Sequence, residues 1–166
     1  MRNSDLERRA RWVRRIAFST DLDTPSAEEM ARRVLGAAPL IRGDNTEPRL
    51  TAHEIVVNCE LRGAARNEAI ACGLALWSAR YRGATISQAE AWVLGAVILA
   101  PRPALLIEAE RLDVEGIAQH FGLTKATVRA RLAAIRVEAK PATRQLSRTS
   151  LEHAETIRVK PFRLHA

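Results

Sequence analysis

Residues 114–133 read VEGIAQHFGLTKATVRARLA, and this stretch has the spacing of two short helices joined by a tight turn. Ala118 is small where the two helices would cross, Gly122 allows the turn, and Thr124 begins the second helix. The apolar residues of a shared core follow the same spacing: Ile117, Phe121, Leu123, Val128 and Leu132. The pattern predicts a helix-turn-helix in which Asp113 caps the first helix and the second helix runs to about residue 137.

A helix-turn-helix can place its second helix in the major groove of DNA. In this stretch Thr124, Lys125 and Arg129 are expected on the outward face, where base edges are read, while Arg131 and Arg136 are expected against phosphate. The same motif is also an ordinary way to pack two helices, so the pattern by itself supports DNA contact and structural packing about equally.

The charge distribution favours a polyanion as the partner of this part of the chain. The 166 residues include 26 Lys plus Arg and 19 Asp plus Glu, which gives a net charge of +7. Residues 1–15 contain six basic and two acidic residues, and residues 113–166 contain ten basic and five acidic residues. Excess positive charge at two ends of a nearly neutral body is typical of contact with nucleic acid, although it also keeps a protein soluble.

Length and composition exclude several classes of protein. With 166 residues, 47% of them hydrophobic, the chain can form one compact domain, or one domain with a small appendage, but not a multidomain assembly. Two cysteines are too few for a disulfide framework, and no apolar run reaches the ~20 residues that span a bilayer. The sequence predicts a cytoplasmic protein without membrane contact. Its few large aromatic residues, Trp12, Trp77 and Trp92, are expected in the core.

The remainder of the chain is predicted to be mostly helical, with a small sheet. Two capping boxes, Ser26 with Glu29 and Ser87 with Glu90, mark the starts of helices. The β-branched run HEIVVN, residues 53–58, is the best strand pattern. Helices are expected at 5–18, 27–35, 64–81, 88–100 and 103–110, and a second short strand at 39–42. The predicted fold class is therefore α+β, mostly helical.

This order of elements resembles the ImmA/IrrE family, zinc metallopeptidase-like proteins of mobile elements and stress responses, some of which cut helix-turn-helix repressors. The segments that carry the resemblance are RNEAIACGLAL (66–76), QAEAWVLGAVILAP (88–101) and IAQHFGLTKATVRARL (117–132). The resemblance implies a degenerate metallopeptidase-like domain with a helical core at 1–112 and a helix-turn-helix-like segment at 113–137. Residues 138–166 are expected to form a basic tail or a docking strand.

The sequence departs from the family pattern at the positions of the zinc ligands and of the general base. An HExxH helix clamps zinc with two histidines one turn apart, and the glutamate between them is the general base. In the register that best fits the flanking apolar residues, these positions are Cys72, Gly73 and Leu76. The third ligand of the family, a glutamate on the next helix, falls on Gln88. These degenerate zinc-site positions cannot supply both of the helix ligands together with the base.

A second register places Asn67, Glu68 and Ala71 at the motif positions, which keeps the glutamate and loses both histidines. Other potential ligands lie far apart in the sequence: His53, Cys59, Cys72 and His120. We therefore expect no catalytic residue, no bound metal and no cofactor.

The sequence favours a non-catalytic transcriptional regulator of a phage or other mobile element that binds DNA, a regulatory protein partner, or both. One alternative is a divergent zinc endopeptidase that cleaves a repressor protein. Another is a protein-interaction or self-association module in which the helix-turn-helix is purely structural.

Overall fold

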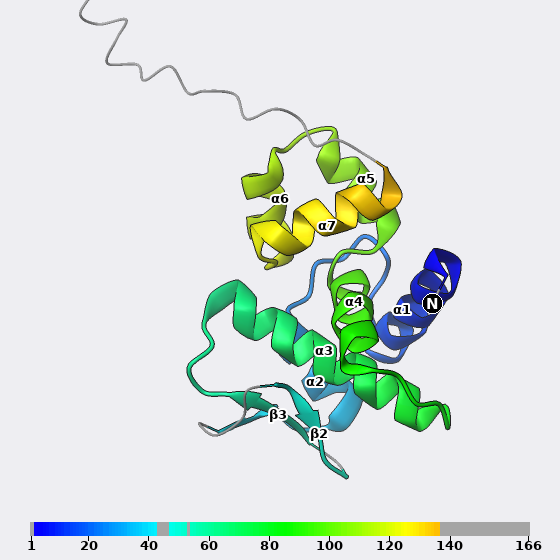
Figure 1. Cartoon of the computed structure of the whole chain (residues 1–166), viewed down its shortest axis with the longest axis vertical. Coiled ribbons are helices and arrows are strands. Elements are labelled where there is room, and N and C mark those ends of the chain that lie inside the picture. Colours follow the sequence, from blue (N-terminus) through cyan, green and yellow to red (C-terminus); the bar gives the residue numbers. More distant parts are fainter. Residues whose placement is uncertain (1, 43–46, 53, 137–166) are drawn as a thin grey trace, which may run out of the picture.

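The computed structural model describes residues 2–42, 47–52 and 54–136, and these residues form seven helices and a small three-stranded sheet (Figure 1). The predicted class, α+β and mostly helical, is confirmed at this level. His53 and the tail predicted at 138–166 lie outside the described residues.

The helices occur in the predicted order, with ends within two or three residues of those expected. They are α1 (Asn3–Ile16), α2 (Ala27–Leu35), α3 (Gly63–Tyr81), α4 (Gln88–Leu99), α5 (Arg102–Ala109), α6 (Val114–Phe121) and α7 (Lys125–Ile135). Ser87 and Glu90 form the predicted capping box at the start of α4. Ser26 caps α2 by accepting a hydrogen bond from the backbone of Glu29 at 3.1 Å, while the carboxylate of Glu29 contacts Arg33 instead of returning to Ser26.

The sheet has the strand order β1–β3–β2, with β1 at Leu40–Arg42, β2 at Arg49–Leu50 and β3 at Ile55–Asn58. Strand β3 pairs in parallel with β1 and antiparallel with β2. Its first three residues are all buried, which agrees with its β-branched run. The sequence does not predict β2, because two residues beside Pro48 are too few to show an alternating pattern.

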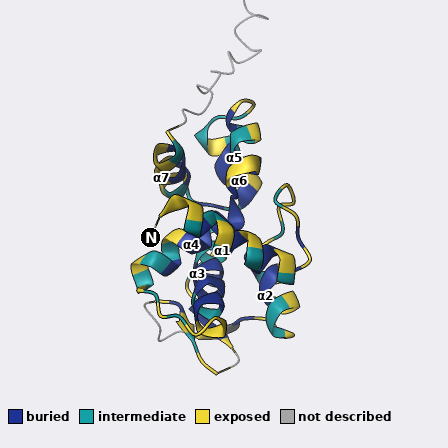
Figure 2. Cartoon of the chain, turned by 90° about the vertical axis from the view of Figure 1, so that its right-hand side faces the viewer, coloured by how far each residue is buried: buried dark blue, intermediate teal, exposed yellow. Residues whose placement is uncertain are grey.

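Helix α3 is the centre of the fold. It lies between the sheet on one side and α4 on the other, and α5, α6 and α7 lie at the end of the molecule opposite the sheet (Figure 1). Its middle residues are buried around the whole circumference of the helix (Figure 2). Small side chains allow this close approach: a Cβ added to Gly95 of α4 would lie 2.8 Å from the backbone atoms of Ala71 and Cys72.

Helix α1 packs on α4 through an apolar stripe and one buried cation. Leu6, Ala10 and Val13 are buried, as the spacing predicts. Arg14 is also fully buried, and its guanidinium donates hydrogen bonds to the backbone oxygens of Thr20, Asp23 and Ile98 at 2.5–3.0 Å. Burial lowers the pKa of Arg14. The arginine thereby anchors the segment after α1 to the carboxyl end of α4, where a helix attracts positive charge.

The prediction that the three tryptophans lie in the core is wrong in detail. All three are only partly buried, and Trp12 and Trp92 pack against the core from its edge. Trp12 and Trp77 stack on each other with ring centroids 5.6 Å apart, and Tyr81 contacts both rings. Small and aliphatic side chains fill the contact between α3 and α4, because these helices approach too closely there to leave room for indole rings.

In the part of the chain that the structure describes, no single helix has both the length and the apolar content needed to cross a membrane. Helices α4 and α5 together have the length and apolar composition of a membrane span, but their axes bend by 63° at the break between them.

The contact between α3 and α4 makes Gly95 sensitive to substitution. We expect Gly95→Ala to lower the free energy of unfolding by about 1–3 kcal/mol, because the new methyl group meets backbone that cannot move aside. Val93→Ala on the same helix is the matched control, since Val93 is 50% exposed and its loss should change stability by less than about 0.5 kcal/mol. Urea unfolding measures both variants, and equal stability of the two would contradict this packing.

Candidate nucleic-acid interface

Helices α6 and α7 form the predicted helix-turn-helix. Asp113 caps α6 by accepting a hydrogen bond from the backbone of Gly116 at 2.8 Å, and Thr124 caps α7 by accepting one from the backbone of Thr127 at 3.3 Å. Gly122 closes α6 with φ at 60°, a left-handed conformation that favours glycine. The residues predicted to form the shared core are all buried: Ile117, Ala118, Phe121, Leu123, Val128 and Leu132.

Two residues at the start of α3 fix the turn of this motif to the rest of the fold. The side-chain amide of Asn67 donates to the Gly122 oxygen at 2.9 Å and accepts from the Ala27 backbone at 2.7 Å. The carboxylate of Glu68 accepts from the backbone N–H of Thr124 at 2.6 Å, at the positive end of α7. Asn67 therefore joins α2, α3 and the turn, while Glu68 joins α3 to the N-cap residue of α7.

The sequence offered Asn67 and Glu68 only as positions of an alternative zinc register, and their structural role was missed. A polar Asn-Glu pair at the start of a long apolar helix was the available signal, since buried polar groups in such a position need partners.

Three of the five residues predicted to contact DNA lie on the exposed side of the motif. Lys125, Arg129 and Arg136 are exposed, and Thr124 is half-buried because its hydroxyl caps α7. Lys125 pairs with Glu115 of α6, with 2.7 Å between Nζ and Oε2. Both side chains are more than half exposed, so this pair contributes little stability and can open toward another anion.

The prediction that Arg131 contacts phosphate is wrong. The Arg131 side chain is 4% exposed, and its Nη2 donates to the Glu7 carboxylate and to the Ala100 oxygen, both at 3.0 Å. Residue 131 lies three positions after Val128 on α7, so it shares the inner face of the helix rather than the outer one. Arg131 instead holds α7 against α1 and the end of α4.

The structure brings together two of the four degenerate zinc-site positions. Gln88, at the start of α4, donates from Nε2 to the Pro48 oxygen at 3.2 Å and to the Cys72 sulfur at 3.5 Å. Burial raises the pKa of the Cys72 thiol to about 12, with a smaller contribution from the charge of Glu47. A thiol in this state is a poor metal ligand, because metal binding requires the thiolate.

The position of the general base, Gly73, is closed by packing. A Cβ added to Gly73 would lie 2.3 Å from the Cγ2 atom of Ile55 on β3, so no glutamate fits at the position of the general base. Leu76 packs against the core and, together with Gln88, lines an open hollow beside β2. Across residues 2–42, 47–52 and 54–136, no three His, Cys, Asp or Glu side chains lie close enough to hold a metal ion.

No protein-family model, curated protein or solved structure matches the chain. The likeness to the ImmA/IrrE family consequently rests on the sequence pattern.

The burial of Cys72 predicts a difference in reactivity between the two cysteines. Burial raises the pKa of the Cys72 thiol far above 8, so at pH 8 this thiol stays protonated and unreactive. We expect Ellman's reagent to modify half-buried Cys59 in the folded protein and to reach Cys72 only in denaturant. In Cys59→Ser protein the native reaction should therefore disappear. Rapid modification of native Cys59→Ser protein would show that Cys72 is open to ligands.

Asn67 provides a test of how the motif is held in place. Asn67→Ala leaves the Gly122 oxygen and the Ala27 N–H without their partner, and we expect a loss of about 1–3 kcal/mol in the free energy of unfolding. Gln119→Ala is the control, because Gln119 is exposed on α6 and should tolerate the change within about 0.5 kcal/mol. Thermal or urea unfolding distinguishes the two variants, and a neutral Asn67→Ala would contradict the proposed fixation.

Proposed function

We propose that this protein is a non-catalytic transcriptional regulator that binds DNA through α6 and α7. The observation that carries the proposal is the pair of exposed cations on α7, Lys125 and Arg129. The helix-turn-helix that presents them is well packed, and α3 holds its turn in place. A rigid motif keeps its contact residues in place before binding, which reduces the entropy lost on association.

The spacing of the exposed residues on α7 suits the major groove. Lys125 and Arg129 are one helical turn apart on the same face, and both are exposed. Ala126, which lies between these two residues, and Ala133, which follows them, are also exposed. Because both side chains are small, the helix backbone can approach the bases closely. In this arrangement Lys125 and Arg129 contact guanine edges or phosphates, the alanines contact thymine methyl groups, and Arg136 contacts phosphate.

The packing around α3 supports the non-catalytic part of the proposal. The position of a general base is filled by Ile55 against Gly73, and Cys72 is held in its protonated form beside Gln88. A phage or other mobile element is the proposed setting, by resemblance to the ImmA/IrrE family, and a regulatory protein is a further proposed partner. Stoichiometric zinc in protein purified without chelator would instead favour the zinc endopeptidase.

The DNA-binding surface is tested with the full chain and sheared genomic DNA from its source organism. Wild-type protein should retain specific fragments, and Lys125→Ala/Arg129→Ala should weaken binding to such a fragment at least tenfold, at about 1–3 kcal/mol per lost base contact. Arg32→Ala/Arg33→Ala on α2 removes the same charge from another surface and should bind almost as the wild type does.

Binding of the wild-type protein to duplex DNA at low ionic strength is the measurement that can contradict the proposal. Phosphate attraction is strongest there, so a wild-type protein that binds no duplex at low salt would contradict the proposal.

A further inference from the structure

A second positively charged surface lies on α1, outside the helix-turn-helix. Arg8, Arg11 and Arg15 are exposed and fall on one face of the helix, with Trp12 between them. Together with Arg82, which follows α3, these residues line a hollow of about 400 Å³. Within the described part of the chain, Arg8 pairs with Asp5 at 2.6 Å, and neither Arg11 nor Arg15 has an ion-pair partner.

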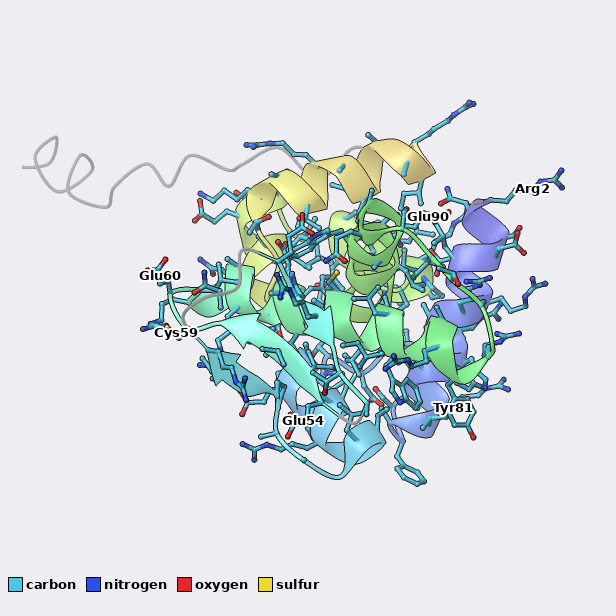
Figure 3. The ribbon with its side chains drawn as sticks, turned by 60° about the horizontal axis from the view of Figure 1, so that its bottom comes forward. Arg2, Glu54, Cys59, Glu60, Tyr81 and Glu90 are labelled. Atoms are coloured by element: carbon cyan, nitrogen blue, oxygen red, sulfur yellow. The ribbon has the colours of Figure 1, made fainter. Side chains whose placement is uncertain are left out.

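Three aromatic side chains that contact one another lie beside the arginines of this surface. The Arg82 guanidinium carbon lies 5.7 Å from the centre of the Trp12 ring, and Trp12 stacks on Trp77. Tyr81 contacts both indole rings and is nevertheless 69% exposed. In Figure 3, Arg2 lies at the start of α1, and Tyr81, the last residue of α3, lies beside the other end of α1; nitrogen-tipped side chains extend outward from the helix between them.

We propose that this arginine surface, formed by Arg8, Arg11, Arg15 and Arg82, binds the phosphodiester backbone of a nucleic acid. Guanidinium groups match phosphate oxygens as planar forks, and among the described residues only Arg8 of these four arginines has an ion-pair partner. From Arg8 to Arg15 the helix rises by about 10 Å, a length that carries about three phosphates on one strand of a duplex. The exposed ring of Tyr81 adds a face on which an unpaired base can stack.

The buried side of α1 argues against a membrane as the binding partner. A helix that lies on a bilayer inserts its apolar face, but the apolar face of α1 packs against the protein core. The residues of that face are Leu6, Ala10, Val13 and Ala17. Only the charged face of α1 is therefore available to a ligand, which favours a polyanion that is read through its phosphates.

The arginine surface is separate from α7, although the two elements touch. The Asn3 side chain at the start of α1 donates to the Ala134 oxygen near the end of α7 at 3.1 Å. A nucleic acid on α1 therefore lies next to the helix-turn-helix without using its outward residues. The inference stands independently of the proposed contact between α7 and DNA.

The test measures binding of the full chain to a labelled oligonucleotide, as a duplex and as a single strand, over a range of salt concentrations. Arg8→Gln/Arg11→Gln/Arg15→Gln removes three potential phosphate contacts. The slope of log K against log salt should become shallower by about 2.7 for a duplex or about 2.1 for a single strand. The form that shows this loss identifies the preferred nucleic acid.

A matched control removes the same charge from elsewhere. Arg42→Gln/Arg49→Gln/Arg62→Gln changes three exposed arginines on and after the sheet and should leave the slope nearly unaltered. An equal loss in both triple variants would overturn the proposal, because it would show a general charge effect. Unfolding curves of the two variants verify that each remains folded, since all six side chains are exposed.

Two further comparisons separate this inference from its competitors. The α1 triple variant can lower the salt slope while Lys125→Ala/Arg129→Ala binds as tightly as the wild type. That result would support the arginine surface and contradict the role of α7. Loss of binding in the α7 variant alone would contradict the arginine surface. Binding to phosphatidylserine vesicles that needs the three α1 arginines, with no binding to either oligonucleotide, would also overturn it.

Discussion

The complete burial of the middle of α3 is the constraint on which the rest of the structure depends. Gly95 allows α4 to approach the backbone of α3, and Gly73 allows β3 to approach from the other side. Side chains between these layers must therefore be small or aliphatic, and the indole rings of Trp12 and Trp92 pack at the edge of the core. The same close packing gives α3 a fixed position from which its first residues can hold the helix-turn-helix.

One helix thus combines a closed interior with a polar end that organises the proposed binding surface. In its middle, Cys72 and Gly73 face Gln88 and Ile55, and this packing leaves no space for a glutamate base. At its start, Asn67 and Glu68 satisfy the backbone groups of the turn before α7. This arrangement is consistent with the proposed role of α3, which is to hold α7 in place for binding.

The elements with strong local signals could be predicted from the sequence. Periodicity and caps located the seven helices that the described residues form, and the β-branched run located β3, because these signals act between residues close in the chain. The burial of Arg131 and Arg14 could not be predicted, since their partners Glu7 and Ile98 are distant in sequence. For the same reason the spacing on α7 identified Lys125 and Arg129 as exposed but placed Arg131 on the wrong face.

Amide hydrogen exchange of the full chain, with and without a retained genomic DNA fragment, tests the central claim most directly. The account predicts that DNA slows exchange in peptides that cover α7 and the turn before it, while peptides around Cys72 and Gln88 are unchanged. If DNA slowed exchange around Cys72 and Gln88 and left exchange in α7 unchanged, the account would be contradicted.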